Sequence, residues 1–257
     1  MLPLEQIARQ ALEMTDLTSL NETDTEQTIQ TLCQQAAAGQ THTAAVCVYP
    51  QFIQTAKDAL AGSGLSSVKV ATVTNFPQGS TDLNKAVLET AHAVSDGADE
   101  VDVVFPYKAL QAGDESIGLE IVKRCKLACG NQAQLKVIIE SGELADTALI
   151  KRAAEICIEG GADFVKTSTG KVPVNATIEA TRVILETIKA SGKPVGFKAA
   201  GGIRTTAQAQ EYIQLAQAIM GEGWVTPDHF RFGASGLVND LKNTMGLAPT
   251  EQQKSNY

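Results

Sequence analysis

Short runs of β-branched and other apolar residues alternate along the chain with longer amphipathic segments. Eight runs have the length and composition of strands: 15–19, 43–49, 68–74, 100–105, 134–140, 163–168, 195–199 and 230–234. They recur roughly every 25–35 residues, which is the length of one strand–helix–strand unit. The first run, TDLTS, has the weakest pattern. The repeat predicts a parallel sheet covered by helices.

The amphipathic segments predict a helix after each run, and capping residues mark the helix ends. The helices are expected at 24–38, 51–61, 81–96, 114–129, 146–159, 176–191, 205–220 and 236–246. Polar residues stand at four N-cap positions: Thr81, Asp114, Asp146 and Thr205. Glycines, which adopt left-handed conformations readily, follow four last turns: Gly97, Gly130, Gly160 and Gly192.

Eight strands that alternate with eight helices are more typical of a closed (β/α)8 TIM barrel, an α/β fold, than of an open doubly wound sheet. The first 14 residues predict an additional N-terminal helix rather than a signal peptide, because they contain acidic residues and no long apolar core. No linker divides the chain, so we expect one barrel domain over residues 1–257. The polar segment at about 248–257 predicts a flexible tail, which could be disordered or could fold Tyr257 over a pocket.

Composition narrows the class of partner. The formal net charge of −8 argues against nucleic acid, which demands clustered Lys and Arg. No stretch reaches the roughly 18 apolar residues of a membrane span.

An odd number of cysteines without a C-x-x-C pair is typical of reduced thiols in a cytoplasmic protein: Cys33, Cys47, Cys125, Cys129 and Cys157. A zinc site at Cys125 and Cys129 is not expected, since no cluster of histidines accompanies them.

Charged residues share one face of several predicted strands, because side chains alternate across a strand. Apolar residues form the face that should pack against the helices: Val101, Val103, Phe105, Leu135, Val137, Ile139, Val165, Val195, Phe197 and Ala199. The opposite face carries Glu100, Asp102, Lys136, Glu140, Lys166 and Lys198, which must then point into the barrel. Buried lysines are rare and costly, so the set suggests a function. The alternatives for Lys166 are a strand-end lysine that reaches solvent or a structural ion pair.

Lys166 and Lys198 lie near the carboxyl ends of consecutive strands, where barrel enzymes carry their catalytic groups. Two ammonium groups about 5 Å apart at an effective dielectric near 20 repel by roughly 3 kcal/mol, which lowers the pKa of one by about two units. The resulting neutral amine can attack a carbonyl and form a Schiff base. Asp102 could hydrogen-bond the charged lysine and move protons, or it could serve only to balance the charge of the pair.

Three glycine-bearing segments follow the last three runs: STGK (168–171), AAGGIRT (199–205) and FGASG (232–236). Such loops, with the N-terminus of a following helix, bind phosphate in many barrels because they expose backbone N–H groups. The residues that fit this role are Gly201, Gly202, Gly233 and Ser235, with charge from Lys171 and Arg204. Tight turns alone would also explain glycines here. The placement of all three segments at one barrel end favours a phosphate site.

Six segments match a known family over nearly the whole chain: TNFP (74–77), GADEVDVVFP (97–106), KVIIE (136–140), DFVKTSTGK (163–171), GFKxAGGxR (196–204) and RFGAS (231–235). They resemble deoxyribose-phosphate aldolase in its bacterial form, a class I, Schiff-base aldolase with a TIM-barrel fold and no metal cofactor. The resemblance implies reversible cleavage of 2-deoxy-D-ribose 5-phosphate to D-glyceraldehyde 3-phosphate and acetaldehyde, in deoxyribonucleotide catabolism. A phosphorylated sugar and small aldehydes are then the expected partners, and the subunit number stays open, with a homodimer as one alternative.

The resemblance implies that Lys166 is the Schiff-base lysine, Lys198 the lysine that perturbs it, and Asp102 the carboxylate of a proton relay. It implies substrate contacts for Thr18, Thr167, Gly170, Lys171, Gly201, Gly202, Arg204, Gly233, Ser235 and Gly236, and a tail contribution from Tyr257. Gly236 stands where the family usually has a second serine. The missing hydroxyl leaves the phosphate affinity open, although the backbone N–H of Gly236 is available.

Two other functions stay open. The chain could be a phosphosugar isomerase that uses acid–base chemistry without a covalent intermediate, or a non-catalytic phosphosugar-binding protein with this fold. Sensitivity to borohydride in the presence of substrate distinguishes the isomerase. Release of acetaldehyde distinguishes the binding protein.

Overall fold

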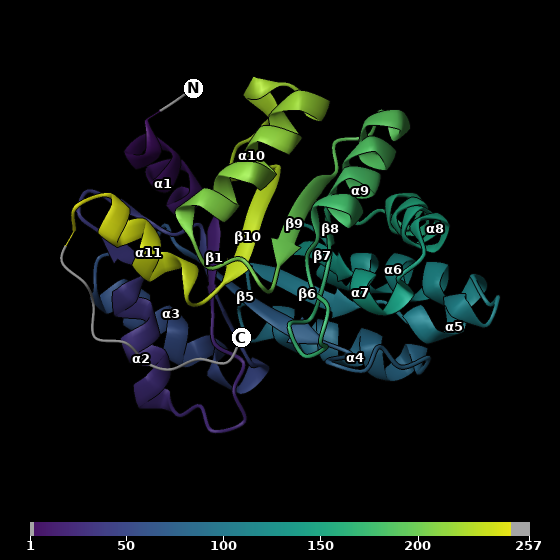
Figure 1. Ribbon diagram of the computed structural model, residues 1–257. Coiled ribbons are helices and arrows are strands. Elements are labelled where there is room, and N and C mark those ends of the chain that lie inside the picture. The colour runs from purple at the N-terminus through teal and green to yellow at the C-terminus, as the bar shows by residue number, and fades with distance from the viewer. Residues whose placement is uncertain (1–2, 248–257) are drawn as a thin grey trace.

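The computed structural model describes residues 3–247, which contain a closed barrel of eight parallel strands (Figure 1). The strands are β1 (Thr15–Thr18), β4 (Ala45–Val48), β5 (Lys69–Thr74), β6 (Glu100–Val104), β7 (Gln134–Ile138), β8 (Phe164–Lys166), β9 (Gly196–Ala200) and β10 (Phe230–Ala234). The barrel closes because β1 pairs with both β4 and β10. The predicted TIM barrel is therefore confirmed, including its weak first strand.

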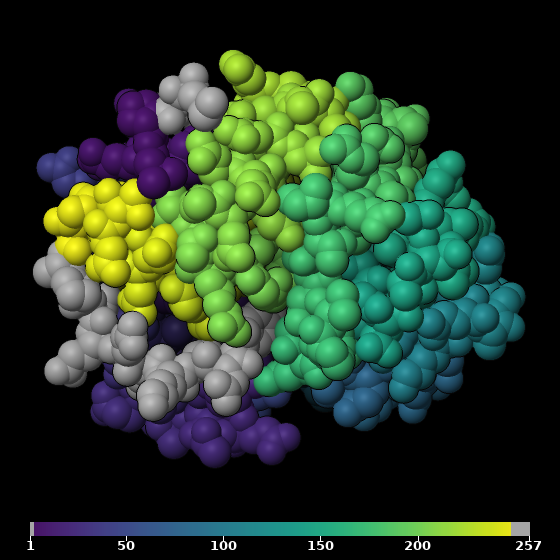
Figure 2. Space-filling model, in the orientation of Figure 1, coloured from purple at the N-terminus to yellow at the C-terminus, as the bar shows by residue number. Residues whose placement is uncertain are grey.

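Helices surround the barrel and follow each strand, as expected. They are α2 (Glu26–Gln35), α3 (Ile53–Gly62), α4 (Leu83–Ser95), α6 (Ser116–Cys129), α8 (Thr147–Glu159), α9 (Ile178–Ser191), α10 (Thr206–Met220) and α11 (Leu237–Thr244). The additional N-terminal helix, α1 (Leu4–Glu13), packs against α10 and α11. Figure 2 shows α11, in yellow, next to the purple N-terminal segment. None of the described helices has the length and apolar character needed to cross a membrane.

Several short elements interrupt this repeat and were not predicted. They are the β2 (Ala37–Ala38) and β3 (Thr41–His42) hairpin, the 3-10 helices η1 (Pro50–Phe52) and η2 (Glu222–Trp224), and the helices α5 (Tyr107–Gln111) and α7 (Ser141–Leu144). The hairpin makes the predicted helix at 24–38 too long. The predicted strand at 134–140 is also too long, because β7 ends at Ile138 and α7 begins three residues later.

Two of the four predicted N-caps are confirmed. The Asp146 side chain accepts hydrogen bonds at the start of α8, and Thr205 forms a capping box at the start of α10. Thr81 is wrong, because Asp82 caps α4. Asp114 lies one residue before the N-cap position of α6, yet its carboxylate still accepts bonds from the backbone N–H groups of the first turn.

Glycines at the helix ends follow the prediction with one exception. Gly97, Gly130 and Gly192 have positive φ angles of 96°, 52° and 64°. Gly160 does not, since its φ is −70° and the next residue, Gly161, adopts the left-handed conformation with φ 88°. Gly160 instead makes room for packing, because an added Cβ would lie 2.5 Å from the Val122 side chain.

The two faces of the barrel wall differ in chemistry. The predicted outward residues are buried in one large apolar cluster with the helices, among them Val101, Val137 and Phe197. Inside the barrel, β4 and β5 contribute part of a second cluster of mostly small residues: Leu20, Ala45, Cys47, Ala71 and Val73. The remaining strands carry the charged interior residues. All five cysteines are buried and free, and burial raises the pKa of Cys47 to about 11.

Candidate active site

Lys166, Lys198 and Asp102 meet inside the barrel, and all three are fully buried. The Nζ atoms of Lys166 and Lys198 each lie 2.8 Å from the same oxygen, Oδ2 of Asp102. The two lysines are neighbours in register on β8 and β9. Lys166 therefore does not reach solvent, and the alternative that it does is removed. Strand alternation places the nitrogens of both lysines on one carboxylate oxygen.

Asp16 and Arg231 extend this cluster, and neither was singled out from the sequence. Oδ2 of Asp16 lies 2.5 Å from Nζ of Lys198, and its Oδ1 lies 2.7 Å from Nη1 of Arg231. Arg231 also binds Glu100, with 2.9 Å between Nη2 and Oε1. The alternation of side chains along a strand could have identified both residues from the sequence. Asp16 shares a face of β1 with Thr18, and Arg231 shares a face of β10 with Gly233.

Lys136 links the three carboxylates of the cluster, which belong to Asp16, Glu100 and Asp102. Its Nζ binds the Glu100 carboxylate, lies 3.3 Å from Oδ1 of Asp102, and is 3.6 Å from Oδ2 of Asp16. Lys136 thus pairs with three carboxylates and Lys198 with two, whereas among the described residues the ion pairs of Lys166 are with Asp102 alone. The cations of the cluster are unequally compensated.

Burial and charge act against each other in this cluster. Burial alone would raise the pKa of Asp102, but Lys136, Lys166 and Lys198 hold that pKa well below its usual range. Likewise, burial would lower the pKa of Lys198, but Asp102 and Asp16 raise it well above its usual range. The arrangement therefore keeps Asp102 anionic and Lys198 cationic.

Asp16 behaves as Asp102 does. Burial would raise its pKa, but Lys198, Arg231 and Lys136 together lower it. Asp16 and Asp102 are thus ionised at neutral pH, and each of these two carboxylates is held by three cations.

Glu140 lies outside the cluster, which corrects its predicted place on the inward face of a strand. The residue follows the end of β7 and has a left-handed backbone, with φ 53° and ψ 58°. Its buried carboxylate accepts hydrogen bonds from Thr169, in the loop after β8. Burial raises the pKa of Glu140, and the bonds from Thr169 offset part of that rise.

The three glycine-bearing loops follow β8, β9 and β10, which are neighbours in the barrel. Gly170, Gly201 and Gly202 have φ angles of 82°, 80° and 85°, a conformation that favours glycine. Gly233 leaves no spare room, because an added Cβ would lie 3.0 Å from Cε of Lys198. The three loops thus lie together at the carboxyl end of the barrel, and Gly233 lies directly against Lys198.

The two side chains predicted to add positive charge lie at the same end. Nζ of Lys171 donates to the carbonyl oxygen of Leu20 at 2.6 Å, which brings the loop after β8 to the end of β1. Arg204 is exposed just before α10, where its backbone N–H donates to Oε1 of Gln208. Both positions are compatible with an incoming anion.

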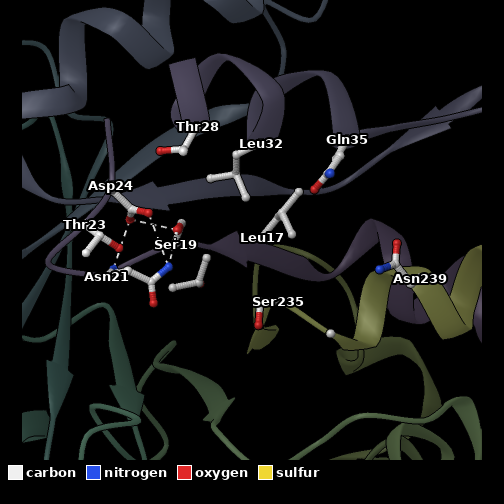
Figure 3. A pocket seen from close by; sticks show the side chains of 12 residues that line it. Leu17, Ser19, Asn21, Thr23, Asp24, Thr28, Leu32, Gln35, Ser235 and Asn239 are labelled. Carbon is white, nitrogen blue, oxygen red and sulfur yellow. Dashed lines mark hydrogen bonds between the residues drawn. The ribbon is translucent and has the colours of Figure 1, made fainter. Parts of the chain in front are cut away.

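A cavity of about 260 Å³ opens beside these loops, over the ends of β1 and β10. Its described lining consists of Leu17, Thr18, Ser19, Asn21, Thr23, Asp24, Thr28, Leu32, Gln35, Ser235, Gly236 and Asn239. Figure 3 shows Ser19, Asn21 and Asp24 joined by hydrogen bonds on one side, with Ser235 and Asn239 lying across from them. Three of the residues predicted to bind substrate, Thr18, Ser235 and Gly236, therefore line one cavity. Lys166 is not among its described lining residues.

Thr18 and Thr167 are buried and bonded to the backbone. The Thr18 hydroxyl donates to the carbonyl oxygen of Asp16 at 2.8 Å. The Thr167 hydroxyl donates to the carbonyl oxygen of Ala200 and accepts from the Ala200 N–H at 3.0 Å, which ties β8 to β9 beside Lys166. Tyr257 lies outside the described residues. Within residues 3–247, no group of three or more His, Cys, Asp or Glu side chains could hold a metal ion.

Comparisons with known proteins identify the family and the fold of this chain. The family model described as DeoC/LacD family aldolase matches residues 10–243. A solved structure of QR15, an aldolase, is 31% identical with a TM-score of 0.75, over 92% of this chain and 96% of that one. A chain from Coccidioides immitis assigned as a deoxyribose-phosphate aldolase is 28% identical with a TM-score of 0.80, over 92% and 86% of the two chains. A chain from Toxoplasma gondii with the same assignment, at 24% identity, 94% and 95% coverage and a TM-score of 0.86, shows the common fold.

Proposed function

Because this chain belongs to the DeoC/LacD family of aldolases, we propose that it cleaves 2-deoxy-D-ribose 5-phosphate reversibly to D-glyceraldehyde 3-phosphate and acetaldehyde through a Schiff base on Lys166. The observation that carries the proposal is the single Asp102 oxygen shared by two buried lysines. Such a pair favours the neutral form of one amine, which is the nucleophile that a Schiff base requires.

We assign the neutral amine to Lys166 from the balance of charge. The cluster joins three carboxylates to four cationic side chains, so the loss of one proton makes it neutral. Arg231 keeps its proton at any ordinary pH. Lys136 and Lys198 each pair with at least two carboxylates, whereas Lys166 shares one oxygen with Lys198.

The first half of the reaction forms the covalent intermediate. The neutral Nζ of Lys166 attacks C1 of the open-chain sugar, and the resulting carbinolamine loses water to give an iminium ion. Asp102 lies next to this nitrogen and stabilises the new positive charge. The iminium is itself the electron sink, so the mechanism uses no metal ion.

The second half breaks the carbon–carbon bond. The C3 hydroxyl loses its proton to a relay of Asp102, Lys198 and water, the C2–C3 bond breaks, and its electrons form an enamine on Lys166. D-Glyceraldehyde 3-phosphate leaves. The relay returns a proton to C2, and water then hydrolyses the iminium to release acetaldehyde and the free amine. Over the full cycle no proton is gained or lost.

The phosphate group would bind at the carboxyl end of the barrel. The loops after β8, β9 and β10 offer backbone N–H groups there, and the first turn of α11 follows Gly236. The residues we assign to this role are Gly170, Lys171, Gly201, Gly202, Arg204, Gly233, Ser235 and Gly236. We assign Thr18 and Thr167 to the orientation of substrate hydroxyls. A single barrel domain and a cytoplasmic location remain part of the proposal, and a homodimer is one alternative for the subunit number.

A coupled assay for acetaldehyde with the purified chain tests this function. We expect release of acetaldehyde that depends on 2-deoxy-D-ribose 5-phosphate, and we expect Lys166→Arg to abolish it with an unchanged circular dichroism spectrum. Binding of the phosphosugar without acetaldehyde would favour the binding-protein alternative. Conversion to an isomer without acetaldehyde would favour the isomerase. Either result contradicts the proposal.

A further inference from the structure

Glu140 is a buried carboxyl group that the mechanism above does not use. It adopts a left-handed backbone conformation, which is unfavourable for a residue with a Cβ atom. Such a conformation persists only where surrounding contacts hold it in place. The backbone on either side of Glu140 contacts the end of β8 at Lys166, and the Glu140 side chain contacts the loop after β8.

The backbone on either side of Glu140 is joined to the end of β8. The N–H of Ile139 donates to the carbonyl oxygen of Lys166 at 3.0 Å, and the N–H of Ser141 donates to the carbonyl oxygen of Thr167 at 2.8 Å. Glu140 is thus flanked by two bonds that hold the peptide of the reactive lysine.

The side chain of Glu140 holds the next part of that loop. Its Oε1 accepts a hydrogen bond from the Thr169 N–H at 3.1 Å, and its Oε2 accepts one from the Thr169 hydroxyl at 2.5 Å. The Thr169 hydroxyl oxygen in turn accepts from the N–H of Lys171 at 3.1 Å. A continuous chain of bonds therefore runs from the Glu140 carboxylate to the start of the proposed phosphate site.

Two close approaches support the same loop further along. An added Cβ at Gly142 would lie 1.9 Å from the carbonyl oxygen of Val174, so the backbone of α7 lies directly against the loop. An added Cβ at Gly201 would lie 2.7 Å from the Asn175 side chain. The loop after β8 is therefore supported at Thr169, at Val174 and at Asn175, the last contact being with the loop after β9.

We propose that Glu140 is a positioning residue that sets the distance between the Schiff-base lysine and the phosphate-binding loop. By bonding Thr169, it fixes the backbone of residues 169–171 relative to Lys166. A substrate with C1 at Lys166 then meets the Gly170 N–H and the Lys171 ammonium group with its 5-phosphate. The inference rests on the proposed function and names a role for Glu140 within that site. A purely structural Glu140 would affect all substrates alike.

The test compares kcat and KM for 2-deoxy-D-ribose 5-phosphate and for 2-deoxy-D-ribose. The variants are Glu140→Gly, which tolerates the left-handed backbone but lacks the carboxylate, and Thr169→Val, which removes the hydroxyl from the other side. In each variant, we expect the preference in kcat/KM for the phosphorylated sugar to fall about tenfold, mainly through a higher KM. Glu140→Gln should recover most of the preference, because its amide oxygen can still accept from the Thr169 N–H and its amide nitrogen can donate to the Thr169 hydroxyl oxygen.

Gly142→Ala perturbs the loop after β8 independently, because it leaves Glu140 unchanged. The added methyl would overlap the carbonyl oxygen of Val174, so we expect the same selective loss of preference for the phosphorylated sugar. Gly62→Ala is the matched control, because no atom of the described residues lies within 4 Å of its added Cβ. If Glu140→Gly fails to fold by circular dichroism, Thr169→Val and Gly142→Ala decide the question.

Each outcome has a distinct meaning. Equal losses on both sugars, or an unchanged preference in Thr169→Val and Gly142→Ala, would overturn the role of Glu140 while the wild-type chain still cleaves both sugars. A wild-type chain that releases no acetaldehyde from either sugar would instead overturn the proposed function. The two failures are therefore separable in one set of assays.

Discussion

Asp102 divides its two oxygens between three lysines. Its Oδ2 is shared by Lys166 and Lys198, and its Oδ1 faces Lys136. Repulsion between the lysines, as expected from their spacing along the strands, is therefore only part of the electrostatics. Because Lys166 and Lys198 share one anionic oxygen, that oxygen stabilises the positive charge of each amine less than it would stabilise a single one.

Lys198→Leu should expose this competition. Without Lys198, the Oδ2 atom of Asp102 becomes the unshared partner of Lys166, which favours the protonated and unreactive form of that amine. We expect the rate of cleavage at pH 7 to fall about a hundredfold or more, and the pH dependence of borohydride trapping to move to higher pH. The measurement is the rate of trapping between about pH 6 and pH 10. An unmoved profile would refute this role of Lys198.

Gly236→Ser tests the proposed phosphate site at its weakest residue. Gly236 precedes α11 with φ −69°, which any residue tolerates, and no atom of residues 3–247 lies within 4 Å of an added Cβ. An added hydroxyl that donates to a phosphate is worth about 1.5 kcal/mol or more. We expect KM for the phosphorylated sugar to fall roughly tenfold, with little change for the unphosphorylated one. Equal effects on both sugars would place the phosphate elsewhere.

Much of the candidate site could be predicted at the level of single residues because alternation along a strand is a local property. It placed Asp102, Lys166 and Lys198 on one face without knowledge of the fold. The alternation rule failed for Glu140, because the left-handed backbone of this residue after β7 breaks the alternation. No local sequence pattern predicts that conformation. The contacts of Thr169 with Glu140 depend on that break.

At the scale of elements, the packing of α6 on the end of β6 depends on the absence of a side chain. A Cβ added to Gly118 of α6 would lie 2.4 Å from the ring of Phe105, which follows β6. Helix α6 could not approach the barrel as closely with a larger residue there.

Gly118→Ala should therefore destabilise the fold by about 1–3 kcal/mol through overpacking. The free energy of unfolding, measured by urea denaturation, checks this result. Gly62→Ala serves as the control, because its added Cβ meets nothing within 4 Å in the part of the chain that the structure describes. Equal stabilities of the two variants would mean that α6 and the end of β6 move apart freely.

Element boundaries were predicted less well than element types. The helices and strands of the repeat follow from periodicity, whereas α5, α7 and the β2–β3 hairpin are too short to show a period of their own. Their positions are set by tertiary contacts, as for α7, whose Gly142 lies against Val174.

At the scale of the whole molecule, closure of the barrel brings β1 beside β10. Asp16 consequently meets Lys198 and Arg231, which are 182 and 215 residues away in the chain. The strand pattern could not reveal these partners, because only closure makes the first and last strands neighbours. The charge balance of the site is therefore a property of the closed barrel.

Closure also predicts a dependence of stability on pH. The pKa of Asp16 is lower in the folded chain than its unfolded value of about 3.9, so its ionised form stabilises the fold above that value, and this contribution is lost as the pH falls further. We expect the free energy of unfolding to decrease from about pH 4 downward. Asp16→Asn should reduce that slope by up to about 1.4 kcal/mol per pH unit. Urea denaturation between pH 5 and pH 2 provides the comparison, and identical slopes would show that Asp16 is not held ionised by its partners.

Reductive trapping reports directly whether Lys166 forms the proposed Schiff base. The purified chain is treated with borohydride in the presence of 2-deoxy-D-ribose 5-phosphate, digested, and mapped by mass spectrometry. The account predicts one adduct, on Lys166, that is absent without substrate. An adduct on Lys136, Lys171 or Lys198 instead, or no adduct from a chain that releases acetaldehyde, would contradict it.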